Sequence, residues 1–247
     1  MALPNFIHIG SAKAGSTYLW EVCKEHLGIY THADSDNPNF FTTQYHKGLP
    51  FYEDTYFPTV ADEKAVVEFS NSYLVHPPAL TRVARHLPDV RLTVTVRNPI
   101  ERCYRSWAGA HYQGRHGLDP DKGVGIPFDQ LLHPNRTTYF RAWAVPGFYA
   151  QHLQTVYSLF PRERVLVMVF DDLESDPEGF LRRYFTFLGV DPEFKTSLIG
   201  VDINPDTDEA KSYRGMSDEM RSELGDIFRE DLAELSQMLG RDLSHWQ

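Results

Sequence analysis

The fold is decided by residues 5–26, which read NFIHIGSAKAGSTYLWEVCKEH. The apolar run that ends at Ile9 is typical of a buried β-strand, and the pattern from Tyr18 to His26 is typical of a helix. Between them lie small residues, hydroxyl groups and one lysine, Lys13. This order of strand, small-residue loop and helix is typical of the start of a βαβ unit.

Further strand patterns follow at 65–69, 91–96 and 164–170. Helix patterns alternate with them: one ends near residue 86, and others cover 100–112, 147–160, 176–188 and 217–239. The alternation predicts an α/β fold, a three-layer P-loop-type architecture in which helices flank a central parallel sheet. We expect a single domain over residues 1–247, with an irregular insertion at 113–135 rather than a linker.

The composition is that of an ordinary globular protein, with 42% hydrophobic and 23% charged residues. Lys and Arg number 24 and Asp and Glu 34, so the net charge of −10 argues against non-specific binding to nucleic acid or anionic membranes. No apolar run approaches the ~20 residues that span a bilayer, and the N-terminus lacks the features of a secretion signal. We therefore expect a soluble, cytoplasmic protein. Its two cysteines, Cys23 and Cys103, are predicted to be buried thiols in helices.

The loop of residues 10–17 suits an anion. Gly10 and Gly15 let backbone amides approach a ligand, the helix start adds unpaired N–H groups, and Lys13 adds a full charge. A phosphate or sulfate group fits these donors, whereas a plain βα turn is the alternative. The loop is not a Walker sequence, because Lys13 precedes Gly15 by two positions, and a standard kinase or ATPase is therefore disfavoured.

A second basic element follows the strand at 91–96. Arg97 ends the strand ahead of Asn98 and Pro99, and Arg102, Arg105 and Ser106 follow on the predicted helix. Planar guanidinium donors suit a phosphate dianion. The alternative for Arg102 and Arg105 is pairing with Glu101 or other surface carboxylates. Ligands of parallel sheets lie beyond the carboxyl ends of the strands, so we expect both basic loops at one crevice.

The two loops together resemble the sulfotransferases that depend on 3′-phosphoadenosine 5′-phosphosulfate (PAPS). In that family the 5′-phosphosulfate loop reads roughly Lys-x-Gly-Thr/Ser-Thr, and the 3′-phosphate site reads Arg-Asn-Pro followed by Arg and Ser on a helix. The matching segments are SAKAGSTYL at 11–19 and RNPIERCYRSW at 97–107, and further matches are EFSNSY at 68–73, VLVMVFDDL at 165–173 and GRDLSHW at 240–246. The resemblance covers nearly the whole chain and looks closest to the bacterial and heparan-type carbohydrate sulfotransferases.

The resemblance implies a PAPS-dependent enzyme whose product nucleotide is 3′-phosphoadenosine 5′-phosphate (PAP). Lys13 would meet the charge that builds on the departing phosphate, as a catalytic and donor-binding residue. The rest of the 5′-phosphate loop would be Ala14, Gly15, Ser16, Thr17 and Tyr18. Arg97 would hold the 3′-phosphate together with Arg105 or Ser106, and a late loop would add Lys211, Tyr213 and Arg214. A solvated polar loop is the alternative for this last group.

Two positions depart from the family pattern. The heparan-type branch carries a catalytic glutamate in Lys-Glu-x-x-Phe-Phe, and this chain has Asn37 there, which cannot accept a proton at neutral pH. We expect Asp36 to act as the base, and His32 is the second candidate. No general base is needed if the acceptor is an amine or an acidic phenol that loses its own proton. A solvated acidic loop is the alternative. The serine that usually lies eight residues after the first arginine is replaced by Arg105, and Ser106 follows it.

The acceptor is expected to bind among aromatic loops over the crevice. Candidate contacts are Phe40, Phe41, Tyr73 and His111, for which core burial is the alternative. Few Lys or Arg residues lie in these loops, which favours a small-molecule or short glycan acceptor.

Two other functions compete with sulfuryl transfer. A P-loop phosphotransferase would need magnesium, for which Asp171 and Asp172 are available, and a nucleotide-binding module without catalysis would explain the missing glutamate. We expect no resident metal, because the sulfotransferase chemistry needs none and the sequence offers no persuasive ligand cluster. The oligomeric state stays open.

Overall fold

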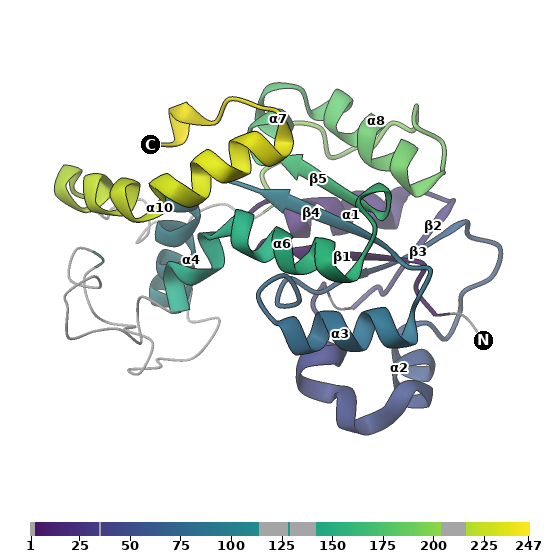
Figure 1. Cartoon of the computed structure of the whole chain (residues 1–247). Helices are drawn as coiled ribbons and strands as arrows, with labels where there is room; N and C mark the ends of the chain where they lie inside the picture. The colour runs from purple at the N-terminus through teal and green to yellow at the C-terminus, as the bar shows by residue number, and fades with distance from the viewer. Residues whose placement is uncertain (1–2, 35, 114–127, 129–141, 204–215) are drawn as a thin grey trace. The chain divides into compact units, whose positions relative to one another are not determined.

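Five parallel strands form the central sheet of the protein (Figure 1). The structure, a computed structural model, describes residues 3–34, 36–113, 128, 142–203 and 216–247. The strands are β1 (Phe6–Gly10), β2 (Ile29–Thr31), β3 (Ala65–Phe69), β4 (Arg91–Val96) and β5 (Val165–Val169), in the order β2-β3-β1-β4-β5. All four pairings are parallel. The predicted parallel sheet is therefore confirmed.

Helices alternate with these strands. They are α1 (Ser16–Glu25), α2 (Gly48–Tyr56), α3 (Pro77–His86), α4 (Pro99–Gln113), α6 (Tyr149–Leu159), α7 (Phe170–Ser175), α8 (Pro177–Leu188) and α10 (Asp218–Leu239). Short helical turns lie at Phe40–Gln44, Tyr45–Lys47, Val145–Gly147, Arg162–Arg164 and Ser244–Trp246. Most of the insertion predicted at 113–135 lies outside the described residues.

The chain forms two compact units, Met1–Val96 with Gln154–Ile203, and Arg97–Leu153 with Asn204–Gln247. The first unit holds the whole sheet, and the second holds α4, the start of α6 and α10. The prediction of one domain over the entire chain stays a prediction.

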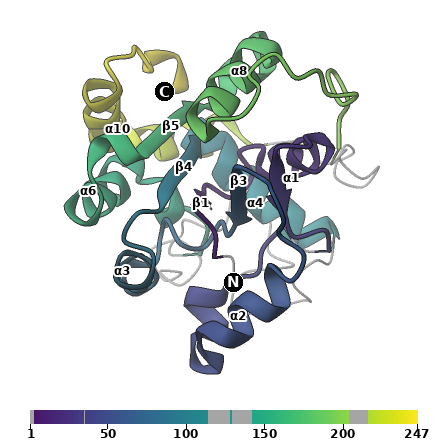
Figure 2. The same cartoon turned by 90° about the vertical axis from the view of Figure 1, so that its right-hand side faces the viewer.

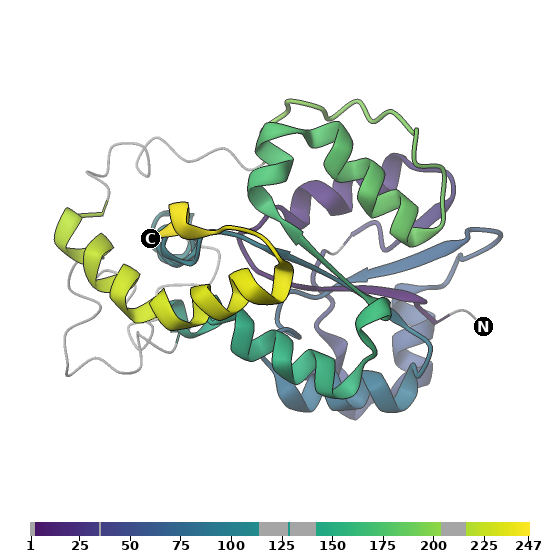
Figure 3. The same ribbon diagram turned by 45° about the horizontal axis from the view of Figure 1, so that its top comes forward.

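In the first unit, helices cover both faces of the sheet (Figures 1 to 3). Apolar side chains of α1 and α8, such as Leu19, Val22 and Phe185, pack with Phe6 and Val67 of the strands in one buried core. The views place α1 and α8 on the same face, and α3 lies on the opposite face. Since neighbouring residues of a strand point to opposite faces, the continuous burial of β1 and β3 requires cover on both sides. The three-layer α/β prediction is thus confirmed.

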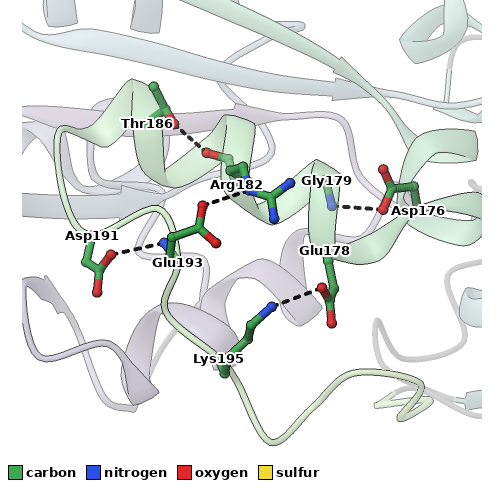
Figure 4. Close-up of polar contacts among 8 residues, drawn as sticks. All are labelled: Asp176, Glu178, Gly179, Arg182, Thr186, Asp191, Glu193 and Lys195. Atoms are coloured by element: carbon green, nitrogen blue, oxygen red, sulfur yellow. Dashed lines mark hydrogen bonds and ion pairs between the residues drawn. The ribbon is translucent and has the colours of Figure 1, made fainter.

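Residues at both ends of helix α8 determine where it begins and ends. The Asp176 side chain accepts a hydrogen bond from the Gly179 amide at 2.9 Å, Pro177 occupies the first turn, and Gly189 ends the helix in the left-handed region. Ion pairs join the helix to the following segment, Arg182 to Glu193 and Lys195 to Glu178, each at 2.9 Å (Figure 4). The side chains of these pairs are exposed to solvent, so the pairs add little to the stability of the fold.

In the second unit, α10 supports the first turn of α6. The Asp231 carboxylate of α10 accepts hydrogen bonds from the amides of Ala150 and Gln151, both at 3.1 Å. Burial raises the pKa of this carboxyl above its ordinary value, and the two amides act against that shift. The Ser217 hydroxyl caps the start of α10 by accepting from Met220 N at 3.2 Å. A long amphipathic helix at 217–239 was predicted, and this prediction is confirmed.

The strand order locates the crevice of the sheet. From β1 the chain builds β2 and β3 on one side of β1, and it then crosses to build β4 on the other side. Crevices at such a reversal, outside the carboxyl ends of the strands, are where open α/β sheets bind ligands. The carboxyl ends of β1 and β4, which are paired strands of the first unit, therefore lie at the reversal.

Candidate functional site

The loop between β1 and α1 is held in an unusual backbone conformation. Gly10, Lys13 and Gly15 have φ values of 142°, 67° and 85°, in the region that side chains disfavour. A Cβ on Gly10 would lie 3.1 Å from the carbonyl oxygen of Asn71, so the close backbone approach requires glycine there. The loop is also tied to β4, because the Ser11 amide and hydroxyl both donate to the Thr95 carbonyl at 2.9 Å.

Helix α1 begins at this loop without a side-chain cap. Gly15 is the N-cap residue in the left-handed region, and no acidic residue lies in the first turn. A Cβ on Gly15 would lie 3.1 Å from atoms of Phe170 and Leu173, so this position is crowded as well. The first-turn amides have no acceptor within the helix, and the helix dipole favours negative charge there. The loop thus combines the features of an anion site.

The side chains of the predicted loop differ in accessibility. Ala14 is fully buried, Ser16 is 4% exposed, and Lys13, Thr17 and Tyr18 are half-buried. The hydroxyl of Ser16 accepts a hydrogen bond from Nδ2 of Asn71 at 2.9 Å. Burial, and next the charge of Glu25, raise the pKa of Tyr18. The structure brings these residues together around the start of α1, and their contact with a nucleotide stays a prediction.

The candidate bases lie on the segment that follows β2. Asp36 accepts a hydrogen bond from Thr17 Oγ1 at 2.9 Å, so this carboxylate is joined to the loop after β1. His32 is held differently: its carbonyl accepts from Trp20 Nε1 at 2.9 Å, and its ring packs edge-on against Tyr56. Asn37, at the usual glutamate position, accepts from the Asn71 amide at 3.0 Å through Oδ1. Of the two predicted bases, Asp36 therefore has the direct side-chain bond to the loop.

A buried glutamate supports this segment, and sequence reasoning missed its role. Glu68 of β3 is 2% exposed and accepts hydrogen bonds from the hydroxyls of Tyr52, Ser70 and Tyr73. Burial raises the pKa of Glu68, and the three hydroxyl donors act against that shift. The available signal was a lone acidic residue within the otherwise apolar AVVEF strand.

The predicted acceptor residues are largely part of this support. Phe40, Phe41 and Tyr73 are fully buried, and the Tyr73 hydroxyl accepts from the Phe41 amide at 3.0 Å while donating to Glu68. In this structure these buried side chains support the segment that follows β2. His111 lies on α4, and its side chain lies outside the described part of the chain. Acceptor contact by these residues stays a prediction.

The Arg-Asn-Pro motif forms the start of α4. Oδ1 of Asn98 accepts from the Ile100 amide at 2.9 Å, and Pro99 is the first helical residue. Asparagine at the N-cap and proline at the next position are favourable at a helix start, which explains the local fold of this motif. Arg97 is half-buried, and its amide donates to the Tyr149 hydroxyl at 3.4 Å.

Arg102 points into the second unit rather than to its surface. Its side chain is 1% exposed and donates to the Ser106 hydroxyl at 3.1 Å and to the Trp143 carbonyl. The alternative of a surface ion pair is therefore wrong for Arg102, and Glu101 pairs instead with Arg221 at 2.8 Å. Spacing along the helix, with Ser106 one turn after Arg102, accounts for their contact.

Three predicted residues, Lys211, Tyr213 and Arg214, lie outside the described residues. Within the part of the chain that is described, no group of three or more His, Cys, Asp or Glu side chains is arranged to hold a metal ion. No helix among the described residues is long and apolar enough to span a membrane. Asp172, a candidate magnesium ligand of the phosphotransferase alternative, accepts from Arg183 Nη1 at 3.4 Å.

Comparisons with known proteins agree with this geometry. The sequence model of the sulfotransferase domain matches residues 3–201. Heparan sulfate glucosamine 3-O-sulfotransferase 3A1 of Mus musculus is 34% identical over 193 residues, which are 76% of this chain and 46% of that protein. The chain spans half or less of the length of the curated relatives that it matches first.

Solved structures of sulfotransferases share the fold of this chain. A sulfotransferase from Alicyclobacillus acidocaldarius superposes with a TM-score of 0.77 at 26% identity, over 100% of this chain and 99% of that one. A mouse sulfotransferase complexed with PAP gives a TM-score of 0.54 at 14% identity, over 94% of this chain and 86% of that one. The second likeness concerns the fold alone.

Proposed function

The chain belongs to the sulfotransferase domain family, a family of transferases, and from this premise we propose that it transfers a sulfuryl group from PAPS to a hydroxyl or amine. The predicted family is confirmed, and the family match favours sulfuryl transfer over the phosphotransferase alternative. The observation that carries the proposal is the uncapped start of α1 behind a glycine loop, at the reversal of the strand order.

The residues of the loop after β1 suit the 5′ end of the donor. PAPS supplies the sulfuryl group, and negative charge builds on its phosphate as the sulfur–oxygen bond breaks. The first-turn amides of α1, that of Thr17 included, and the hydroxyl of Ser16 would bind this phosphate. The Thr17 hydroxyl donates its one proton to Asp36 in this structure. Lys13 would place its ammonium group where the charge develops, which stabilises the transition state more than the ground state.

The 3′-phosphate is assigned to the loop after β4. Arg97 follows the last residue of that strand directly, and β4 pairs with β1. Its guanidinium would bind a phosphate through two parallel hydrogen bonds. Ser106 or Arg105 would add a further donor from α4, and Lys211, Tyr213 and Arg214 would close over the nucleotide.

The acceptor would be a small molecule or a short glycan. Relatives named as heparan sulfate sulfotransferases act on glycans, which supports a sugar acceptor. The segments 32–57, 70–78 and 109–150, in which the acceptor is expected to bind, carry few Lys or Arg residues, and this counts against a long anionic polysaccharide.

A substitution of Lys13 tests the transfer reaction. We expect Lys13→Ala to lower kcat by at least about a hundredfold, because a donor aimed at developing charge is lost. Transfer of labelled sulfate from PAPS to a panel of amine, phenol and sugar acceptors measures this. Lys24→Ala is the matched control, because Lys24 lies on α1, the helix after the loop, with its ammonium over the Trp20 ring. Full turnover in Lys13→Ala would make this lysine a bystander, and no transfer by the wild type would favour the binding-module alternative.

A substitution of Asp36 tests the proposed base. Asp36→Asn preserves an oxygen that accepts from Thr17 but cannot take a proton, so we expect kcat to fall about a hundredfold or more and the acidic limb of the pH–rate profile to vanish. Asp34→Asn, at an exposed carboxylate two residues earlier, is the control. An unchanged pH–rate profile would show that Asp36 is not the base and only accepts the hydrogen bond from Thr17. The second candidate is then tested by comparing His32→Ala with the wild type in the same assay.

A further inference from the structure

Asn71 lies in the turn after β3 and contacts three parts of the candidate site. Its amide donates to Oδ1 of Asn37 at 3.0 Å, and its Nδ2 donates to the Ser16 hydroxyl at 2.9 Å. Its carbonyl oxygen closely approaches Gly10, where any Cβ would lie 3.1 Å away. One residue therefore joins the segment of the candidate bases to both ends of the loop after β1.

The bond from Asn71 determines what the Ser16 hydroxyl can do. A hydroxyl has one proton to donate and two lone pairs that accept. Since Ser16 accepts from an amide NH₂ group, its own proton has to point elsewhere. Among the described residues, no acceptor of that proton is found. Ser16 is 4% exposed and is the first residue of α1, where the anion site begins.

The other side of the Asn71 amide is left without a partner. Its Oδ1 is buried and makes no hydrogen bond in the described part of the protein. Buried polar atoms in folded proteins are nearly always paired, so an unpaired one calls for a reason other than stability. The reason here is that the side-chain amide of Asn71 turns its Nδ2 toward Ser16, which leaves Oδ1 without a partner.

We infer that Asn71 is a positioning residue for the donor nucleotide: it fixes the Ser16 hydroxyl as a hydrogen-bond donor to the 5′-phosphate. Oδ1 of Asn37 accepts from the backbone amide of Asn71 and so holds Asn71 in place. Asn37 stands where the heparan-type branch has its catalytic glutamate, so this position has a structural role here. This inference rests on the proposed function, because it takes the ligand of the loop to be the 5′-phosphate of PAPS or PAP.

Calorimetric titration with two nucleotides tests the inference. PAP carries the 5′-phosphate and adenosine 3′-monophosphate lacks it. In Asn71→Ala the Ser16 hydroxyl rotates freely, and we expect PAP to bind about fivefold more weakly, with no change for adenosine 3′-monophosphate. Asn71→Asp keeps the shape but offers only acceptors to Ser16 and adds negative charge, so PAP should weaken by at least about tenfold.

A double-mutant cycle separates positioning from general stability. If Asn71 acts through Ser16, Ser16→Ala and Ser16→Ala/Asn71→Ala should bind PAP equally well. Asn5→Ala is the matched control, because the Asn5 side chain makes hydrogen bonds too, with Lys64 O and Val66 N, but at the amino end of β1. It should lower the melting temperature without changing PAP affinity.

The possible outcomes are distinguishable. If the wild type binds PAP and Asn71→Ala binds it equally well, or if the loss persists in the Ser16→Ala background, the inference is overturned while the proposed function stands. An equal loss for both nucleotides would also overturn it. If the wild type does not bind PAP at all, the proposed function fails and the inference fails with it.

Discussion

His8 is an ionisable residue in the middle of β1, and the fold keeps it neutral. Its side chain is fully buried, with Nδ1 3.0 Å from Thr93 Oγ1 and no hydrogen-bond partner for Nε2 in the described residues. Burial lowers the pKa of His8 to about 3 from its ordinary value of 6.5. The unfolded chain therefore binds a proton at His8 in a pH range where the folded protein does not.

This difference predicts an acid-sensitive component of stability. The contribution of His8 is fully present above pH 6.5 and is lost as the pH falls from 6.5 toward about 3, at about 1.4 kcal/mol per pH unit. His8→Phe should remove this slope. Urea unfolding at pH 7, 6 and 5 measures it, with His46→Phe at an exposed position as the control. Equal slopes in wild type and His8→Phe would show that the fold does not lower the pKa of His8.

At the same scale, both cysteines behave as the sequence predicts. Cys23 and Cys103 are buried free thiols, and burial raises their pKa values to about 12 and about 11. Each lies on an apolar helix face, where the pattern of the neighbouring residues indicates the core.

At the scale of elements, β3 anchors the segment that carries the candidate bases. Glu68 binds the hydroxyls of Ser70 and Tyr73, and these hydroxyls accept from the amides of Asn39 and Phe41. A strand of the sheet thus positions the loop of residues 37–41 through two hydroxyl bridges.

Removing the carboxylate should loosen that loop. We expect Glu68→Ala to lower the free energy of unfolding by about 2–4 kcal/mol, because three buried hydroxyls lose their acceptor. The amides of Asn39 and Phe41 should exchange with solvent faster, which hydrogen-exchange NMR resolves. Glu174→Ala, on the exposed side of α7, is the control. Unchanged exchange at both amides would show that the loop is held without Glu68.

The elements that could be predicted are those with a long and uniform pattern. Apolar β-branched runs identified β3, β4 and β5, and the spacing of apolar residues identified α8 and α10. Strand β2 has only three residues at the edge of the sheet and was not predicted. Helix α2 contains Gly48 and Pro50, which indicate a loop locally, so tertiary packing decides its structure.

At the scale of the whole molecule, the site divides into a predictable and an unpredictable part. The glycine loop with Lys13 and the Arg97 motif are contiguous in sequence, and their spacing carried the prediction. The partners that orient them are distant along the chain: Asn71 lies 55 residues from Ser16, and Tyr52 lies 16 residues from Glu68. No local pattern encodes such contacts, because they depend on strand order and loop packing.

The proposed function requires one nucleotide to bind with one phosphate at the loop after β1 and the other at the loop after β4. Titration calorimetry in EDTA with PAP, 5′-AMP and ADP tests it most directly. We predict that the wild type binds PAP at least about tenfold more tightly than 5′-AMP or ADP, and that Arg97→Ala abolishes this preference while the exposed-arginine control Arg85→Ala keeps it. Equal affinity of the wild type for PAP and ADP, or binding that requires magnesium, would contradict the account.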